Sequence, residues 1–195
     1  MAQGRIKGAA LREFLEWYRT AFGEGDMRRR LAETPTLASL PNLDMGIAGC
    51  GVLASGWYDA DDIHLLLDGI VRGRTETEIQ QIVNSGTEAA LTRTLTGLHR
   101  TLMRVVGSPP LHARFSQRLW STYYDTGRVQ SVCVNQHTQS ITYTGWTSHH
   151  PVLCAMTTAS DAVIFPLMGL SGVTVSAVSC VNDGAPGCTH LVEWQ

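Results

Sequence analysis

The sequence predicts an α+β fold in which N-terminal helices are followed by a β-β-α-β-β segment, whose antiparallel sheet packs against the helices. The spacing of the apolar residues predicts this fold. They recur about every 3.6 residues in the first two thirds of the chain, as in amphipathic helices, and about every 2 residues in the segments after it that are expected to be strands. The 195 residues suit one domain. We expect it to comprise a helical and loop extension over 1–56, a helical part over 57–127 and the β-β-α-β-β part over 128–195.

Three helices and one loop are expected in the first third of the chain. Residues 9–22 place apolar side chains at steps of three and four, the pattern of an amphipathic helix, and residues 27–31 predict a short helix after it. Residues 34–56 are rich in proline, glycine and serine, so a surface loop is expected there. Asp59 is a suitable N-cap for the next helix, whose buried face ends at Val71.

A long helix is expected to begin at a capping box, Thr75-Glu-Thr-Glu78. Apolar residues then keep a helical period as far as Val105, which predicts a helix about 40 Å long. Gly86 lies on its apolar face, where a partner helix can approach closely. Another helix is expected to begin at Pro109. Its inner face is predicted to consist of Phe115, Leu119 and Tyr123.

Alternating patterns begin after Gly127. Residues 129–134 and 140–145 predict a β-hairpin, and residues 151–170 predict an apolar helix with Pro166 near its end. The last two strands are expected at 173–180 and 188–194.

Composition and charge exclude several classes of protein. Hydrophobic residues make up 44% and charged residues 16% of the chain, which indicates a folded protein. A net charge of −2 provides no basic field for nucleic acid, and no apolar run approaches the ~18 residues of a membrane span. The N-terminus lacks the apolar core of a signal peptide, so a cytoplasmic protein with reduced thiols is expected. Motifs of nucleophilic enzymes and phosphate loops are absent, and no enzyme is expected.

Three of the five cysteines form the main candidate site. Cys180 and Cys188 flank a turn and are expected to face each other across a hairpin, and Cys154 lies near the start of the preceding helix. Three thiolates at one edge of a sheet suit zinc, which prefers tetrahedral sulfur and nitrogen ligands. A fourth ligand would be His150 or His190. The alternatives are plain core packing of the cysteines, or a disulfide between Cys180 and Cys188 in an oxidising compartment.

Two further groups of residues are candidates for binding. The pair His149-His150 before Pro151 would ligate a metal or cap a helix, or would simply lie on the surface. Aromatic and apolar residues where the helices meet the sheet would pack the core or line an apolar ligand pocket. The candidate pocket walls are Phe115, Leu119, Tyr123 and Trp146.

The segment 118–128, the Gly145-Trp146 strand end and the cysteine hairpin ending at Trp194 resemble a group of small stand-alone bacterial proteins, mostly delta-proteobacterial. These belong to the superfamily that unites 4-vinyl-reductase domains, haem-nitric-oxide-binding domains and TRAPP Golgi-transport subunits. The resemblance covers roughly residues 9–194.

The resemblance implies a zinc site and a dimer. In 4-vinyl-reductase-like sensor domains, three cysteines and a glutamate hold a structural zinc beside a ligand pocket, and the matching cysteines here are Cys154, Cys180 and Cys188. Ala177 stands at the position of the glutamate. Such domains often dimerise through their helices, for which the stripe over 79–105 is a candidate.

The haem-binding branch resembles the chain less. Its Tyr-x-Ser-x-Arg clamp is not found as such, since the nearest segment is Tyr124-Asp-Thr-Gly-Arg128, and no haem is expected.

Two functions follow as hypotheses. The first is a non-enzymatic sensory domain that binds a small hydrophobic or aromatic molecule between helices and sheet, with a structural zinc and as a homodimer. The alternative is a structural or interaction subunit, as in the TRAPP branch, that acts through a dimer or partner interface without a small ligand.

Overall fold

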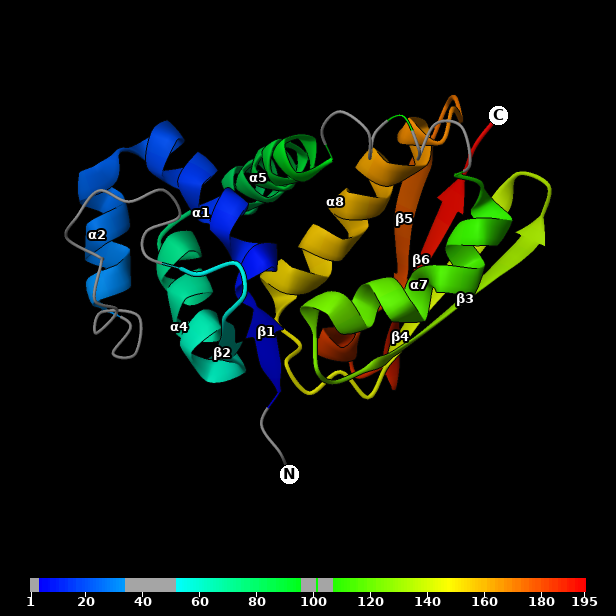
Figure 1. The fold of residues 1–195 in the computed structure, drawn as a ribbon. Helices are drawn as coiled ribbons and strands as arrows, with labels where there is room; N and C mark the ends of the chain where they lie inside the picture. The colour runs from blue at the N-terminus through cyan, green and yellow to red at the C-terminus, as the bar shows by residue number, and fades with distance from the viewer. Residues whose placement is uncertain (1–3, 34–51, 96–100, 102–106) are drawn as a thin grey trace.

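The computed structural model describes residues 4–33, 52–95, 101 and 107–195 (Figure 1). Its helices are α1 (Gly8–Phe22), α2 (Glu24–Ala32), α4 (Ala60–Val71), α5 (Glu76–Thr94), α7 (Pro109–Tyr123) and α8 (Pro151–Leu167). Its strands are β1 (Arg5–Lys7), β2 (Trp57–Asp59), β3 (Arg128–Asn135), β4 (Thr138–Thr144), β5 (Thr174–Ser179) and β6 (Gly187–Glu193), with a 3₁₀ turn at Val181–Asp183 before β6. Among these described helices, none combines the length and the apolar character that crossing a membrane requires.

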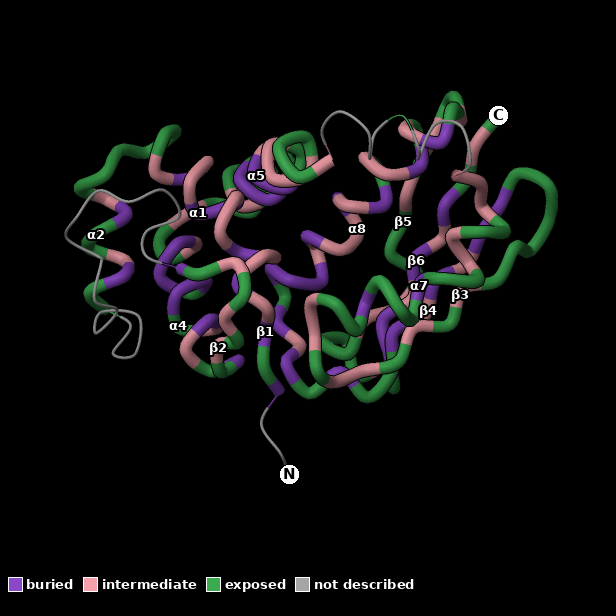
Figure 2. Tube along the Cα trace, viewed as in Figure 1, coloured by how far each residue is buried: buried purple, intermediate pink, exposed green. Residues whose placement is uncertain are grey.

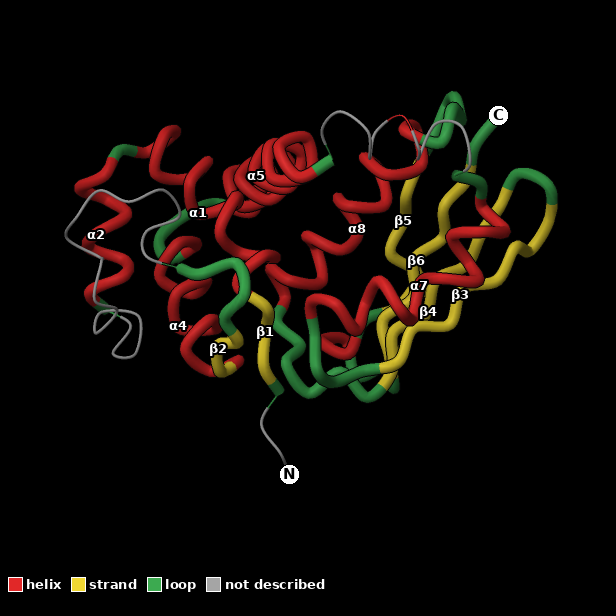
Figure 3. Tube along the Cα trace, in the orientation of Figure 1, coloured by secondary structure: helices red, strands yellow, loops and turns green. Residues whose placement is uncertain are grey.

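The predicted α+β class, with N-terminal helices followed by a β-β-α-β-β segment, is confirmed. Helices α1, α2, α4 and α5 form one half of the molecule, and the β3–β6 sheet with α7 forms the other (Figures 1 and 3). Helix α8 runs between the two halves and packs on α5 as well as on β5 and β6. The short strands β1 and β2, which were not predicted from the sequence, pair antiparallel within the helical half.

The four-stranded sheet has the order β3-β4-β6-β5 and is antiparallel throughout. Because residues opposite each other in an antiparallel pair share one face, Tyr143 with Cys188 and Ile141 with His190 form a common buried face. Helices α7 and α8 cover this face (Figure 2). The topology therefore carries Cys188 towards the start of α8.

The start of α5 agrees with the sequence prediction, and its end does not. Thr75 and Glu78 form the predicted capping box, with both reciprocal hydrogen bonds present. The helix expected to reach Val105 ends at Thr94, because Leu95 leaves the helical region with φ −93° and ψ 56°. The threonines and the glycine around this point are weak helix formers, which explains the stop. Residues 96–100 and 102–106, and most of the loop expected over 34–56, lie outside the described residues.

The predicted inner face of α7 is wrong by one position. Ser116 and Trp120 are its buried residues, whereas Phe115 and Leu119 are 39% and 50% exposed. Trp120 decides the orientation, because its Nε1 donates to the Thr126 carbonyl at 2.8 Å and its ring stacks on Tyr124. A large aromatic ring with a buried hydrogen bond outweighs a stripe of aliphatic residues.

Gly86 lies where α1 crosses α5, as the sequence predicted for a close helix contact. A Cβ there would lie 2.4 Å from a Phe14 ring carbon and 2.8 Å from a Trp17 ring carbon. This face of α5 is therefore covered by α1 of the same chain, so the dimer expected through it has no support at Gly86.

Replacing Gly86 by alanine should destabilise the protein by about 1–3 kcal/mol, since the rings must shift in a packed core. Alanine at exposed Gly25 of α2, where a Cβ would meet nothing within 4 Å, is the control. There the better helix propensity should raise stability by up to about 1 kcal/mol. Urea unfolding of both variants measures the difference, and equal stabilities would contradict the contact.

Candidate functional site

A cluster of three thiols and one imidazole lies where the sheet meets the start of α8. Its members are His149, Cys154, Cys180 and Cys188, and their ligand atoms all lie within 4.8 Å of one another. Cys188 is on β6, Cys180 directly follows β5, and Cys154 is in the first turn of α8. The structure therefore brings together the three cysteines that were selected from the sequence.

Three distances in the cluster lie close to the edge lengths of a coordination tetrahedron. Cys180 Sγ lies 3.4 Å from Cys188 Sγ and 3.7 Å from Cys154 Sγ, and His149 Nε2 lies 3.3 Å from Cys188 Sγ. Zinc bonds of about 2.3 Å to sulfur and 2.0–2.1 Å to nitrogen place tetrahedral ligands about 3.8 Å apart for two sulfurs and about 3.6 Å for sulfur and nitrogen. The four donors are thus spaced for one ion.

The protonation of the free cluster follows from its burial. Burial raises the pKa of the Cys154 and Cys188 thiols above the usual value, and burial also lowers the pKa of His149. A neutral imidazole offers its lone pair directly, whereas the thiols must lose protons to a metal. Metal binding at this cluster would therefore release protons.

The two histidines expected to provide a fourth ligand are occupied elsewhere. His150 caps α8, because its Nδ1 accepts from Val152 N, and its Nε2 lies 3.2 Å from Asp68 Oδ1. His190 Nδ1 lies 3.1 Å from Asp161 Oδ2, and its Nε2 lies 3.0 Å from Thr158 Oγ1. His149 takes the place that these two were expected to fill. Ala177, the position of the expected glutamate, is exposed and pairs with His190 across the sheet.

A groove of about 490 Å³ separates α5 from the second half of α8. One wall is mostly polar and comes from α5, and the other is apolar and comes from α8. The described residues that line it are Asn84, Glu88, Thr92, Leu95, Ala159, Ala162, Val163, Pro166 and Leu167.

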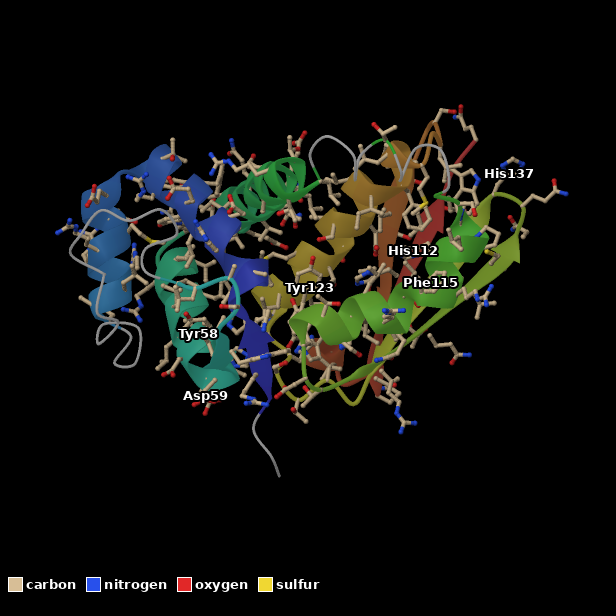
Figure 4. All side chains as sticks on the ribbon, in the orientation of Figure 1. Tyr58, Asp59, His112, Phe115, Tyr123 and His137 are labelled. Carbon is tan, nitrogen blue, oxygen red and sulfur yellow. The ribbon has the colours of Figure 1, made fainter. Side chains whose placement is uncertain are left out.

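The predicted pocket walls lie apart from this groove. Phe115 (Figure 4) is on the exposed side of α7. Leu119 is 50% exposed on the same helix, and Trp146 packs edge-on against Trp120. Tyr123, at the end of α7, is half-buried. The groove was not predicted from the sequence because it forms between helices that are far apart in the chain.

Comparisons with known proteins identify solved structures that share this fold. No protein-family model matches the chain, and no curated protein matches its sequence. An H-NOX protein from S. oneidensis in the Fe(II)NO ligation state is 12% identical, with a TM-score of 0.67 over 97% of this chain and 99% of that one. The Fe(II) unliganded H-NOX protein from K. algicida is 12% identical, with a TM-score of 0.65 over 97% of each chain. An oxygen-binding H-NOX domain related to soluble guanylate cyclases, in its oxygen complex, is 10% identical, with a TM-score of 0.62 over 97% and 95%.

At these identities the likeness shows a shared fold alone. Among the branches named in the sequence resemblance, the shared fold is that of haem-nitric-oxide-binding domains. The sequence motifs placed the chain nearer the 4-vinyl-reductase and TRAPP branches, and that placement has no support from these structures.

The expectation that the chain takes no haem is contradicted by this fold. Two of the structures that share it are of Fe(II) H-NOX proteins, and another is described in terms of haem redox potential and porphyrin distortion. The expectation depended on a single five-residue motif, and Tyr124-Asp-Thr-Gly-Arg128 in fact keeps the spacing of Tyr-x-Ser-x-Arg, with Thr126 in place of the serine.

The described lining of the groove lacks the ligands that a haem needs. Haem iron is held by histidine, cysteine, methionine or tyrosine. Within the described part of the chain, the residues lining the groove include none of these four types. The described lining therefore does not fit a haem.

Proposed function

We propose that the chain is a non-enzymatic regulatory domain that senses a small molecule. The observation that carries the proposal is the groove of about 490 Å³ between α5 and α8, within a fold shared over nearly the whole chain with H-NOX domains. Its volume falls in the range of about 300–1,000 Å³ that ligand pockets occupy. The apolar wall suits the hydrophobic or aromatic body of a ligand, and the polar wall suits one or two hydrogen-bonding groups.

Helix α8 links this groove to the rest of the molecule. Its first turn contains Cys154 of the thiol cluster, and its second half forms the apolar wall of the groove. A ligand that favours one spacing of α5 and α8 would shift the helical half relative to the sheet, because a ligand stabilises the arrangement that binds it best.

We also propose that the thiol and imidazole cluster holds a structural zinc ion. The tetrahedral spacing of His149, Cys154, Cys180 and Cys188 supports it. A site with four protein ligands leaves no open position for a substrate, which favours a structural role over a catalytic one.

Ligand binding is tested by thermal shift with aromatic molecules and with haemin, and haemin binding is also followed by its absorption spectrum. A ligand at a hundredfold excess over its Kd should stabilise the protein by about 2.7 kcal/mol. Ala162→Trp, which fills the groove from an exposed position on α8, should remove the shift. Leu65→Trp on the exposed side of α4 is the control and should keep it. A shift that survives Ala162→Trp would place the ligand elsewhere.

A further inference from the structure

The connection between β4 and α8, residues 145–150, touches both halves of the molecule. On one side His149 Nε2 lies within 3.3 Å of Cys188 Sγ in the thiol cluster. On the other side His64 Nε2, on α4, donates to the Ser148 carbonyl at 3.1 Å, and His150 Nε2 donates to Asp68 Oδ1, also on α4, at 3.2 Å. Consecutive residues of this connection thus contact opposite partners.

The backbone explains this alternation. His150 has φ −145° and ψ 145°, an extended conformation in which neighbouring side chains, here those of His149 and His150, point to opposite sides. The contact of Ser148 with α4 is made by its backbone carbonyl. The residues that face α4 are held firmly: Ser148 is fully buried and its hydroxyl accepts from Trp146 Nε1 at 2.7 Å, and the rings of His64 and His150 are 5.0 Å apart. A displacement of His149 therefore moves residues that have little space to adjust independently.

We infer that metal occupancy of the thiol cluster controls how firmly α4 docks on the rest of the molecule, with residues 148–150 as the link. This inference rests on the proposed metal centre. With an ion bound, His149 is fixed by a coordination bond, and Ser148 and His150 are held against α4. Without it, contacts of a thiol with an imidazole are weak, and the connection can move away from α4.

Hydrogen exchange of α4 measures this link. Zinc added to chelator-treated protein should slow exchange of the α4 amides at least tenfold more than exchange of the α5 amides. Helix α5 is the internal reference because it packs on α1 and α8. The variant His64→Ala/Asp68→Ala removes both contacts and leaves the four metal ligands in place. In this variant zinc should slow α4 and α5 alike.

Cobalt(II) in place of zinc separates the two ways of failing, because thiolate ligands give it an intense visible and near-ultraviolet spectrum. If neither protein shows that spectrum, the proposed metal centre is absent. The proposed link between metal occupancy and the docking of α4 is then overturned as well. If both proteins bind cobalt and zinc slows α4 of the wild type no more than α5, the link alone is overturned. Metal-dependent protection of α4 that persists in the variant also overturns it.

Discussion

Replacing Cys188 by serine is expected to prevent zinc binding and to lower the stability of the protein by about 3 kcal/mol or more, since bound metal contributes its binding energy to folding. Cys188 is 1% exposed and lies close to both Cys180 and His149, so its loss removes a central ligand. For a chain of this length the melting temperature should fall by roughly 6–12 °C. Metal analysis of protein purified without chelator and a thermal melt in the presence of zinc give the two readings.

Cys133→Ser is the matched control, because Cys133 is a free, exposed cysteine of β3 and is not a member of the cluster. It should keep both the metal and the melting temperature. A wild-type protein that carries less than about 0.2 equivalents of zinc would contradict the proposal, since structural zinc is held tightly. Equal metal content in the two variants would also contradict it.

Local rules predicted most of the secondary structure. The capping box at Thr75, proline at the start of α7 and α8, and the change of apolar period near residue 128 each act within a few residues. The errors arose where tertiary contacts decide the outcome. In α7 the buried face differs from the prediction by one position, because Trp120 is held by a hydrogen bond to Thr126. Strand β1 pairs with β2, some fifty residues later, and both strands are too short to show an alternating pattern.

The candidate site shows the same division. The hairpin and the helix start, both readable from the sequence, bring Cys154, Cys180 and Cys188 together. Choosing between His149 and His150 needed the cap of α8. Pro151 occupies the first position of that helix, which makes the preceding residue the N-cap, so His150 binds the backbone and His149 is free to face the thiols. The proline after His150 is therefore the signal in the sequence that favours His149 as the ligand.

The groove had no such local signal. The groove depends on the crossing of α5 and α8, between which the described part of the chain contains α7, β3 and β4. The likeness to H-NOX structures extends over 97% of the chain at 12% identity or less, so it resides mainly in the arrangement of the elements.

Replacing Asp161 by alanine should have the second large effect, a loss of about 3–5 kcal/mol of stability. Asp161 is 4% exposed and His190 is fully buried, and the two face each other at 3.1 Å between α8 and β6. The alanine leaves the Nδ1 of His190 without its acceptor in the protein interior, where an unpaired polar group keeps its full desolvation cost. Asp161→Asn, which retains an oxygen acceptor, should lose less.

The pair of His150 and Asp68 is the comparison that isolates burial as the cause. Its nitrogen-to-oxygen distance is 3.2 Å, nearly the same, but the Asp68 side chain is 61% exposed. Water can replace that carboxylate, so Asp68→Ala should cost no more than about 1 kcal/mol. Urea unfolding of the two alanine variants under the same conditions measures the difference. If both variants lose the same stability, burial of the pair of Asp161 and His190 is not the cause of the loss.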